Sequence, residues 1–237
     1  MNQHRNAHER IIDEKTAADL KRRLEAEMKE PVTVVAIVGS VNAEYSNWTA
    51  RLVKELAELS EKILVKIVDA DSEADEIERI GMDPKRTPAI LIGPEKVSVR
   101  YFGAPSGYEA WGFVETIIQV SRGDSGLSSE TVETLRRLVK LGKRVKLQVF
   151  VTPTCPYCPH QALLANRFAI AVPEAIEAET VEAWENPDMA DALGVSAVPD
   201  TAVYVQEERR WVLKNRLIGV QPEEKFAVDV VVSALGE

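Results

Sequence analysis

The sequence predicts an α/β protein made of two tandem copies of one fold, each a mixed β-sheet flanked by helices. An apolar, β-rich segment that begins at Val32 is matched by a second that begins at Val145, and a helical segment precedes each of them. Pro88, which precedes a later strand, recurs as Pro199 about 110 residues further on, far beyond the period of a solenoid repeat. After its first helix, each copy continues with strand, helix and strand, which favours a right-handed parallel crossover. Two further strands before its last helix favour an antiparallel hairpin.

The first copy begins with a helix at about residues 13–29, since Leu20, Leu24 and Met28 fall on one face and Pro31 stops the helix. A short helix is expected before Pro88. The remaining elements are expected to be a strand at 32–38, a helix at 47–60, strands at 63–69, 89–92 and 97–102, and a helix at 108–121.

The second copy repeats this order after a linker at residues 122–126. Its first helix, 129–141, has acidic residues early and basic residues late, and Gly142 ends it, as the helix dipole and C-cap rules favour. The elements that follow are expected to be a strand at 145–151, a helix at 156–171, strands at 176–181, 200–203 and 211–218, and a helix at 222–235. The sequence therefore predicts two α/β units in tandem, residues 1–124 and 125–237.

The composition excludes several classes of protein. With 237 residues, 45% hydrophobic and 28% charged, the chain has enough apolar side chains for a core, and no apolar run is long enough to span a membrane. The first 30 residues are rich in charge and lack the apolar middle of a signal peptide, so we expect a cytoplasmic location. A net charge of −9 without a basic block argues against nucleic acid as a partner.

Both cysteines of the chain lie in Cys155-Pro156-Tyr157-Cys158, after the strand at 145–151 and at the start of the next helix. A cysteine at a helix N-terminus faces unpaired backbone N–H groups and the positive end of the helix dipole, which stabilise a thiolate. Pro156 suits a first helical turn because no N–H is needed there. Cys158 lies one turn further on, so the pair can close a small disulfide and pass two electrons through a mixed disulfide.

Three inert roles compete with redox chemistry. A zinc site needs two further ligands, and the histidines are His4 and His8 in a polar tail and His160 after the motif. A structural disulfide across three residues restricts the unfolded chain little and so stabilises little. Buried inert thiols are disfavoured at a helix start. Redox chemistry is therefore favoured, and we expect no metal and no bound cofactor.

Longer stretches of the chain extend the pattern and carry a resemblance to a known family. The chain is similar over nearly its whole length to the glutaredoxin-like protein disulfide oxidoreductases of thermophilic archaea and bacteria, which are tandem thioredoxin folds. The matching stretches are VRYFGAPSGYE at 99–109, VSRG at 120–123, VFVTPTCPYCP at 149–159, VEA at 181–183 and AVP at 197–199.

The resemblance implies a role for each residue of the motif. Cys155 would be the nucleophile and Cys158 the resolving thiol, while Pro156 and Tyr157 would tune the pair. The implied activity is exchange of two electrons with protein disulfides and dithiols.

The resemblance also makes Pro199 a cis-proline that faces the cysteines. A cis bond there turns the backbone of Val198 toward the disulfide, where its N–H and C=O are placed to hold an extended substrate strand. Family members usually carry a second cysteine pair in the first unit, where this chain has Ala43 and Ser46. The first site is therefore expected to be vestigial, with Pro88 marking a retained groove, or to brace the second unit.

A second resemblance changes the expected partners. The N-terminal domain of the flavin subunit of alkyl hydroperoxide reductase is also a tandem thioredoxin fold with a cysteine pair in its second half alone. That likeness implies an electron shuttle from a flavin reductase to a peroxiredoxin, with a thioredoxin-reductase-like flavoenzyme as donor. The chain has no Gly-x-Gly-x-x-Gly sequence, so the flavin would belong to a separate protein.

A hypothesis from another class is a peptide-binding or chaperone module whose redox activity is secondary. The sequence favours the thiol–disulfide oxidoreductase, because the cysteine motif stands in the strand–turn–helix context that its chemistry needs. Two nearby polar residues, His160 and Glu182, are expected to be ordinary solvent-facing side chains.

Overall fold

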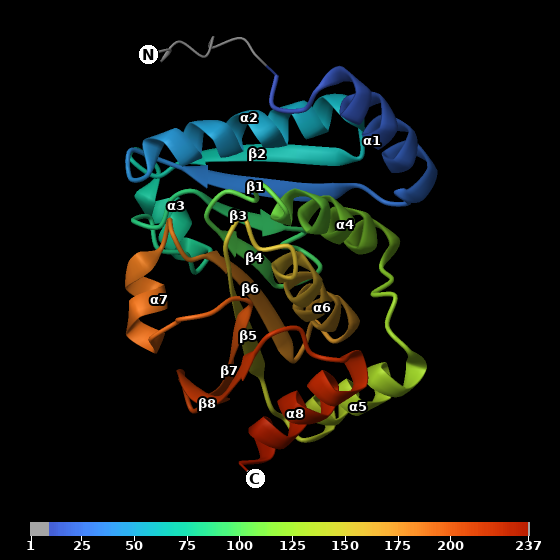
Figure 1. Cartoon of the computed structure of the whole chain (residues 1–237), viewed down its shortest axis with the longest axis vertical. Coiled ribbons are helices and arrows are strands. Elements are labelled where there is room, and N and C mark those ends of the chain that lie inside the picture. Colours follow the sequence, from blue (N-terminus) through green and yellow to red (C-terminus); the bar gives the residue numbers. More distant parts are fainter. Residues whose placement is uncertain (1–9, 237) are drawn as a thin grey trace.

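The computed structural model describes residues 10–236, which form eight helices and eight strands (Figure 1). The N-terminal half contains α1 (Glu14–Glu27), β1 (Val32–Val38), α2 (Ala43–Leu59), β2 (Ile63–Asp69), α3 (Ala74–Arg79), β3 (Ala89–Ile92), β4 (Val99–Phe102) and α4 (Glu109–Arg122). The C-terminal half contains α5 (Ser129–Lys140), β5 (Val145–Val151), α6 (Cys158–Ala171), β6 (Ile176–Glu182), α7 (Pro187–Leu193), β7 (Asp200–Glu207), β8 (Arg210–Ile218) and α8 (Glu223–Leu235).

One mixed sheet runs through both halves in the order β2-β1-β3-β4-β6-β5-β7-β8. β1 pairs with β2 in parallel and with β3 in antiparallel fashion, and β5 pairs with β6 and β7 in the same two ways. Each half ends in an antiparallel hairpin, β3–β4 or β7–β8. The halves join where β4 and β6 pair in parallel, with Val99 opposite Ala178 and Phe102 opposite Val181. The duplicated α/β architecture expected from the sequence is confirmed.

The helices cover the two faces of the sheet unequally. A large apolar cluster packs α1, α2, α4, α5, α6 and α8 against one face, and it includes Leu24, Leu56, Leu135, Phe168 and Phe226. A smaller cluster packs the short helices α3 and α7 against the other face, around Ile77 and Ala190. In Figure 1, α3 and α7 lie next to each other on one side of the molecule. Burial of these apolar side chains provides the main stabilisation of the fold.

Helices α4 and α6 pack closely where the halves meet. Gly112 allows this approach, because a Cβ there would lie 3.3 Å from the Cβ of Pro159. Further along, the Asn166 side chain donates hydrogen bonds to the Tyr101 hydroxyl at 3.0 Å and to the Thr116 hydroxyl at 3.1 Å. These buried bonds fix one orientation of the two halves, since a buried polar group is costly without its partner.

The pairing brings the functional loops to one edge of the sheet. β1, β2, β4, β5 and β6 all run in the same direction, so their carboxyl ends share that edge. The chain returns to the same edge just before β3, at Thr87-Pro88, and just before β7, at Val198-Pro199, and both of these peptide bonds are cis. The expected first site and the cysteine motif therefore lie along one continuous rim.

Two helices, α2 and α6, begin more than one residue away from the start that the sequence predicts. α2 begins at Ala43, four residues before the expected start, because Asn42 turns the chain with a left-handed φ of 50° and its carbonyl accepts a 2.9 Å bond from the Ser46 N–H. Ala43 and Ser46 are therefore inside the first turn of α2. α6 begins at Cys158 rather than Pro156, for a reason that lies in the loop before it.

Candidate active site

The loop between β5 and α6 carries the cysteine motif. A turn closes it early, where the Cys155 N–H donates to the Thr152 carbonyl at 3.1 Å. Pro156 and Pro159 have no N–H to donate. At the start of the helix, the His160 N–H donates to the Tyr157 carbonyl at 3.2 Å. The helix therefore starts two residues later than expected, with Cys155 in the turn and Cys158 as its first residue.

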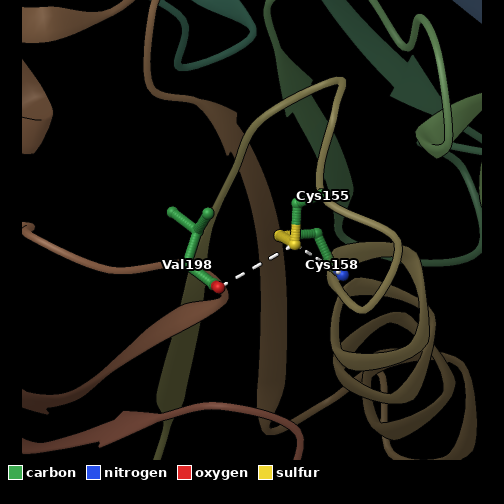
Figure 2. The surroundings of a disulfide bond; sticks show 3 residues. All are labelled: Cys155, Cys158 and Val198. Atoms are coloured by element: carbon green, nitrogen blue, oxygen red, sulfur yellow. Dashed lines mark hydrogen bonds between the residues drawn. A yellow bond between two sulfur atoms is a disulfide. The ribbon is translucent and has the colours of Figure 1, made fainter.

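The two cysteines form a disulfide and have very different exposure. Their Cα atoms are 5.5 Å apart, which suits a disulfide. Cys155 is partly exposed, whereas Cys158 is fully buried and belongs to the large apolar cluster. The Cys158 N–H donates to Cys155 Sγ at 3.1 Å (Figure 2). The sulfur that solvent reaches is thus also the one that receives a backbone donor, which favours a thiolate there.

Val198 faces the disulfide from the opposite side of the site. Its carbonyl oxygen lies 3.8 Å from Cys155 Sγ (Figure 2). The turn behind it is tightly held, because the Arg216 guanidinium bonds the buried Asp200 carboxylate at 2.9 Å and the Leu193 carbonyl at 2.6 Å. The Gly219 N–H also donates to the Pro199 carbonyl at 2.8 Å. These bonds fix the backbone at which a substrate strand would pair.

The structure brings together some of the residues expected at the site and separates others. Cys155, Cys158 and Val198 meet at one point, with Pro199 directly behind Val198. Pro156 and Tyr157 are both exposed on the loop between the cysteines. The residues of the expected first site lie at the other end of the same edge, at the start of α2 and before β3: Ala43, Ser46 and Pro88.

At that first site, side chains of the protein occupy the groove. The Asn42 amide donates to the Thr87 carbonyl at 3.1 Å and also to the Glu185 carbonyl of the C-terminal half at 3.1 Å. Ser46 is buried, and its hydroxyl accepts the Gly39 N–H at 3.3 Å. Thr87 corresponds to Val198 in the repeat but is only 3% exposed. Its carbonyl is therefore closed to a passing peptide.

Three buried glutamates lie between the two sites: Glu109, Glu182 and Glu185. Burial and the nearby Glu182 raise the pKa of Glu109 to about 8, and neither carboxyl oxygen of Glu109 has a hydrogen-bond partner within the described chain. Burial raises the pKa of Glu185 to about 7 and also raises that of Glu182. The expectation that Glu182 faces solvent is wrong, because β6 is buried along its whole length. Sequence reasoning also missed Glu109 and Glu185. The 176–182 segment alternates apolar and acidic residues, which is typical of a strand with one face in solvent, so nothing in the sequence indicated that both faces are covered.

A connection from the N-terminal half completes the wall of the cysteine site. Residues 103–108, which we call the strap, join β4 to α4. The Ala104 N–H donates to the Glu185 carboxylate at 3.0 Å, and the Tyr108 N–H donates to the Pro153 carbonyl of the cysteine loop at 3.0 Å. Gly107 makes this contact possible, since a Cβ there would lie 2.2 Å from the Pro153 oxygen.

Other features of the described chain bear on the expected partners. Within residues 10–236, no group of three or more His, Cys, Asp or Glu side chains is arranged to hold a metal ion. Two of the histidines considered as zinc ligands, His4 and His8, lie outside the described residues. His160 is exposed, and its ring contacts the Trp111 ring at a centroid distance of 5.2 Å. In the same part of the chain, no helix combines the length and apolar character that a membrane crossing needs.

Comparison with known proteins agrees with this geometry. The family model described as "Thioredoxin domain" matches residues 145–212. The thioredoxin of Methanocaldococcus jannaschii is 35% identical over 60 residues, which are 25% of this chain and 71% of that protein. A probable thioredoxin of Methanothermobacter marburgensis is 32% identical over 59 residues, which are 25% of this chain and 69% of that protein.

Two solved structures resemble nearly the whole chain. A protein disulfide oxidoreductase from Aeropyrum pernix has a TM-score of 0.80 and 32% identity, and the match covers 95% of this chain and 94% of that one. The NTD_N/C domain of alkylhydroperoxide reductase AhpF from Enterococcus faecalis has a TM-score of 0.74 and 19% identity, and covers 92% of this chain and 99% of that one. At that identity, the second likeness concerns the fold alone.

Proposed function

Because this chain belongs to the thioredoxin-fold protein disulfide oxidoreductases and is a thiol–disulfide oxidoreductase, we propose that Cys155 attacks the substrate disulfide and that Cys158 resolves the product. The observation that carries this assignment is the unequal exposure of the two sulfurs. Cys155 is reached by solvent and Cys158 is buried beneath it. The Cys158 N–H, 3.1 Å from Cys155 Sγ, supports the attacking thiolate.

The exchange balances in two steps. The Cys155 thiolate attacks one sulfur of the substrate disulfide, forms a mixed disulfide and releases the other substrate sulfur as a thiolate, which takes a proton from water. The Cys158 thiol then loses its proton and attacks Cys155 Sγ, which closes the enzyme disulfide and frees the second substrate thiol. Two electrons have passed to the substrate, and a dithiol donor restores the reduced pair by the reverse sequence.

Val198 and Pro199 are proposed to hold the substrate during this exchange. The Val198 carbonyl lies beside Cys155 Sγ, so a polypeptide pairing with this backbone would bring its own sulfur to the attacking atom. Pro156 and Tyr157 are proposed to shape the loop between the cysteines. We also propose that the protein consists of two units, residues 1–124 and 125–237. The first unit has a vestigial site at Ala43, Ser46 and Pro88.

The electron donor and acceptor form a second part of the proposal. A cysteine pair confined to the C-terminal half favours a shuttle role, in which a thioredoxin-reductase-like flavoenzyme supplies electrons and a peroxiredoxin receives them. A cytoplasmic location agrees with such partners. The test couples the protein to a purified thioredoxin reductase with NADPH, and then to a peroxiredoxin with hydrogen peroxide. NADPH consumption that requires both this chain and the peroxiredoxin supports the shuttle, whereas protein disulfide reduction without peroxide turnover restricts the role to general exchange.

Trapping experiments test the thiol assignment. Cys158→Ser is expected to accumulate mixed disulfides with a protein substrate, since no second thiol remains to release them. Cys155→Ser is expected to form none and to lose insulin reduction. Iodoacetamide should label Cys155 of the reduced protein in preference to Cys158 at neutral pH, as read by mass spectrometry. Preferential labelling of Cys158 would reverse the assignment.

The chaperone alternative predicts a different result from the same variants. A double variant, Cys155→Ser with Cys158→Ser, keeps both proline turns but has no thiol. If the double variant suppresses aggregation of a reduced protein as well as the native chain does, and the native chain does not accelerate insulin reduction, peptide binding is the main activity. Insulin reduction that the double variant lacks supports the oxidoreductase.

A further inference from the structure

The most exposed aromatic side chains of the protein gather on one rim. Within residues 10–236, the five aromatic side chains with the greatest exposure are Tyr157 (67%), Trp184 (61%), Tyr108 (52%), Tyr45 (44%) and Trp111 (40%). All five lie in, or directly after, connections that leave the carboxyl ends of the parallel strands. Exposed aromatic groups in one place are unusual on a free surface and are typical of sites that bind a partner.

The two C-terminal members, Tyr157 and Trp184, lie beside other residues of the cysteine site. Tyr157 stands between the two cysteines, next to the helix start. Trp184 follows β6, and with Thr152 and Val198 it lines an open hollow next to the disulfide. The Val198 carbonyl of that hollow is the oxygen 3.8 Å from Cys155 Sγ.

The N-terminal members reach the same site through specific contacts. Tyr108 ends the strap, and its N–H bonds the Pro153 carbonyl of the cysteine loop. Trp111 lies three residues later and contacts His160, two residues beyond Cys158. Tyr45 belongs to α2, which is tied to the C-terminal half by the bond from Asn42 to the Glu185 carbonyl. Three of the five aromatic groups therefore come from the half that has no cysteine.

We propose that these five aromatic side chains form a docking surface that spans both halves and binds the polypeptide around a substrate disulfide. The inference rests on the proposed function of Cys155 and Cys158, and it makes the N-terminal half a part of the substrate site. Trp184 shares a hollow with Val198, and Tyr108 is bonded to Pro153 of the cysteine loop, so a chain bound at these aromatic groups is held next to the reacting sulfur.

The size and the apolar character of the docking surface indicate that it binds a polypeptide rather than a small disulfide. In the sheet order β1-β3-β4-β6-β5, four strand spacings separate β1 from β5, which is about 19 Å. About six residues of extended polypeptide cover that distance, whereas a small disulfide does not. Next to Tyr108 and Trp111 lies a largely apolar hollow between α1, α2 and α4, which Trp48 and Leu52 also line. The preferred substrate is therefore a polypeptide with apolar side chains flanking its disulfide.

Comparing the reduction of a large and a small disulfide tests the docking surface separately from the proposed function on which it rests. Steady-state reduction is measured with dithiothreitol as donor, using insulin as the protein disulfide and bis(2-hydroxyethyl) disulfide as the small one. The variants are Tyr108→Ser, Trp111→Ser and their combination. Trp211→Ser is the matched control, because Trp211 is a partly exposed aromatic residue on β8, away from the strap.

The double variant is expected to lower the ratio of kcat/KM for insulin to kcat/KM for the small disulfide about tenfold, mainly through KM, as for loss of two contact aromatics. The control is expected to keep the ratio within twofold of the native chain. Failure of the native chain to reduce either substrate would overturn the proposed function itself.

Three results would overturn the docking surface alone. One is a double variant whose ratio stays within twofold of the native value. Another is a control that lowers the ratio as much as the double variant does. The third is sedimentation showing that the native chain self-associates through these aromatic residues, since a second copy would then cover the surface. If the Tyr108 and Trp111 variants fold poorly by circular dichroism, the same ratio of kcat/KM values is measured for Tyr45→Ser on α2. A ratio for Tyr45→Ser that equals the native ratio also contradicts the inference.

Discussion

The two cis-proline turns of this protein occupy equivalent places in the repeat but present their backbone differently. At the C-terminal turn, the Val198 carbonyl lies beside Cys155 Sγ and Val198 remains partly exposed. At the N-terminal turn, the Thr87 carbonyl accepts the Asn42 amide, and the Thr87 side chain bonds the Val41 carbonyl at 2.5 Å. The copy that has no cysteine therefore also has a closed turn, and we expect that restoring the cysteines alone does not open this turn to a substrate.

The residues that close the first groove also bond the C-terminal half. Asn42, which fills it, also bonds the Glu185 carbonyl, and the Glu185 carboxylate in turn accepts the strap N–H of Ala104. The strap then contacts the cysteine loop through Tyr108 and Pro153. A continuous set of hydrogen bonds therefore joins the turn of the copy without cysteines to the cysteine loop.

The largest expected effect comes from restoring cysteines to the first site. Ala43→Cys with Ser46→Cys, placed in a chain that also carries Cys155→Ser and Cys158→Ser, is expected to show less than about 1% of native insulin reduction. Ser46 is buried and the Thr87 carbonyl is occupied, so a substrate strand cannot approach the new pair. Activity within tenfold of the native protein would show that cysteine loss alone separates the two sites. Adding Asn42→Gly, which frees the carbonyl, should raise the activity if closure matters.

The second effect concerns the buried carboxyl group between the sites. Burial raises the pKa of Glu109 to about 8, while an unfolded chain has an ordinary value of about 4.3. The folded protein therefore holds this proton across a pH range in which the unfolded chain has lost it, and stability falls as pH rises from about 5 to about 8. The loss approaches about 1.4 kcal/mol per pH unit for a single group.

Glu109→Gln removes this dependence, because a neutral amide has no proton to lose. Urea unfolding at pH 5.5 and 7.5 should show a smaller decline in the free energy of unfolding for the variant than for the native chain. Glu44→Gln, at an exposed position on α2, is the control and should keep the native decline. Equal declines for Glu109→Gln and the native chain would mean that Glu109 is ionised in the fold.

The sequence predicted the elements of both copies but not what distinguishes their sites. Strand 63–69 and strand 145–151 match β2 and β5 residue for residue, because alternation and apolar runs report burial on a sheet face. The hydrogen bonds by which Asn42 closes the first site could not be predicted from the sequence, because they depend on a left-handed turn and on a partner 143 residues away. The contact between the strap and the cysteine loop could not be predicted for the same reason. In the sequence Gly107 is typical of an ordinary turn, and only the folded chain brings it against Pro153.

The third effect isolates the strap. Gly107→Ala introduces a Cβ at a φ of +60° and 2.2 Å from the Pro153 oxygen, so the strap or the cysteine loop must move. Gly123→Ala is a matched control, because its φ is +62° and no atom lies within 4 Å of the added Cβ. Gly123→Ala is expected to lower the free energy of unfolding by about 1 kcal/mol, the backbone cost alone. Gly107→Ala is expected to lower it by about 1–2 kcal/mol more, and this excess measures the clash with Pro153. Equal losses by urea unfolding would show that the strap does not bear on the cysteine loop.

The smallest effect is expected from Glu44, one of the two residues between Ala43 and Ser46 in the first copy. Glu44 is exposed in the first turn of α2, in the half that has no cysteine. Glu44→Gln removes one charge in solvent, where screening leaves little of its field at the disulfide about 19 Å along the edge. The redox potential of the Cys155–Cys158 pair, measured by equilibration with glutathione, should therefore change by less than about 30 mV, the equivalent of about 1.4 kcal/mol for two electrons. A larger shift would mean that the charge of the first copy reaches the second site through the hydrogen bonds of Asn42 and Glu185, and the two sites would then be electrostatically coupled rather than only packed together.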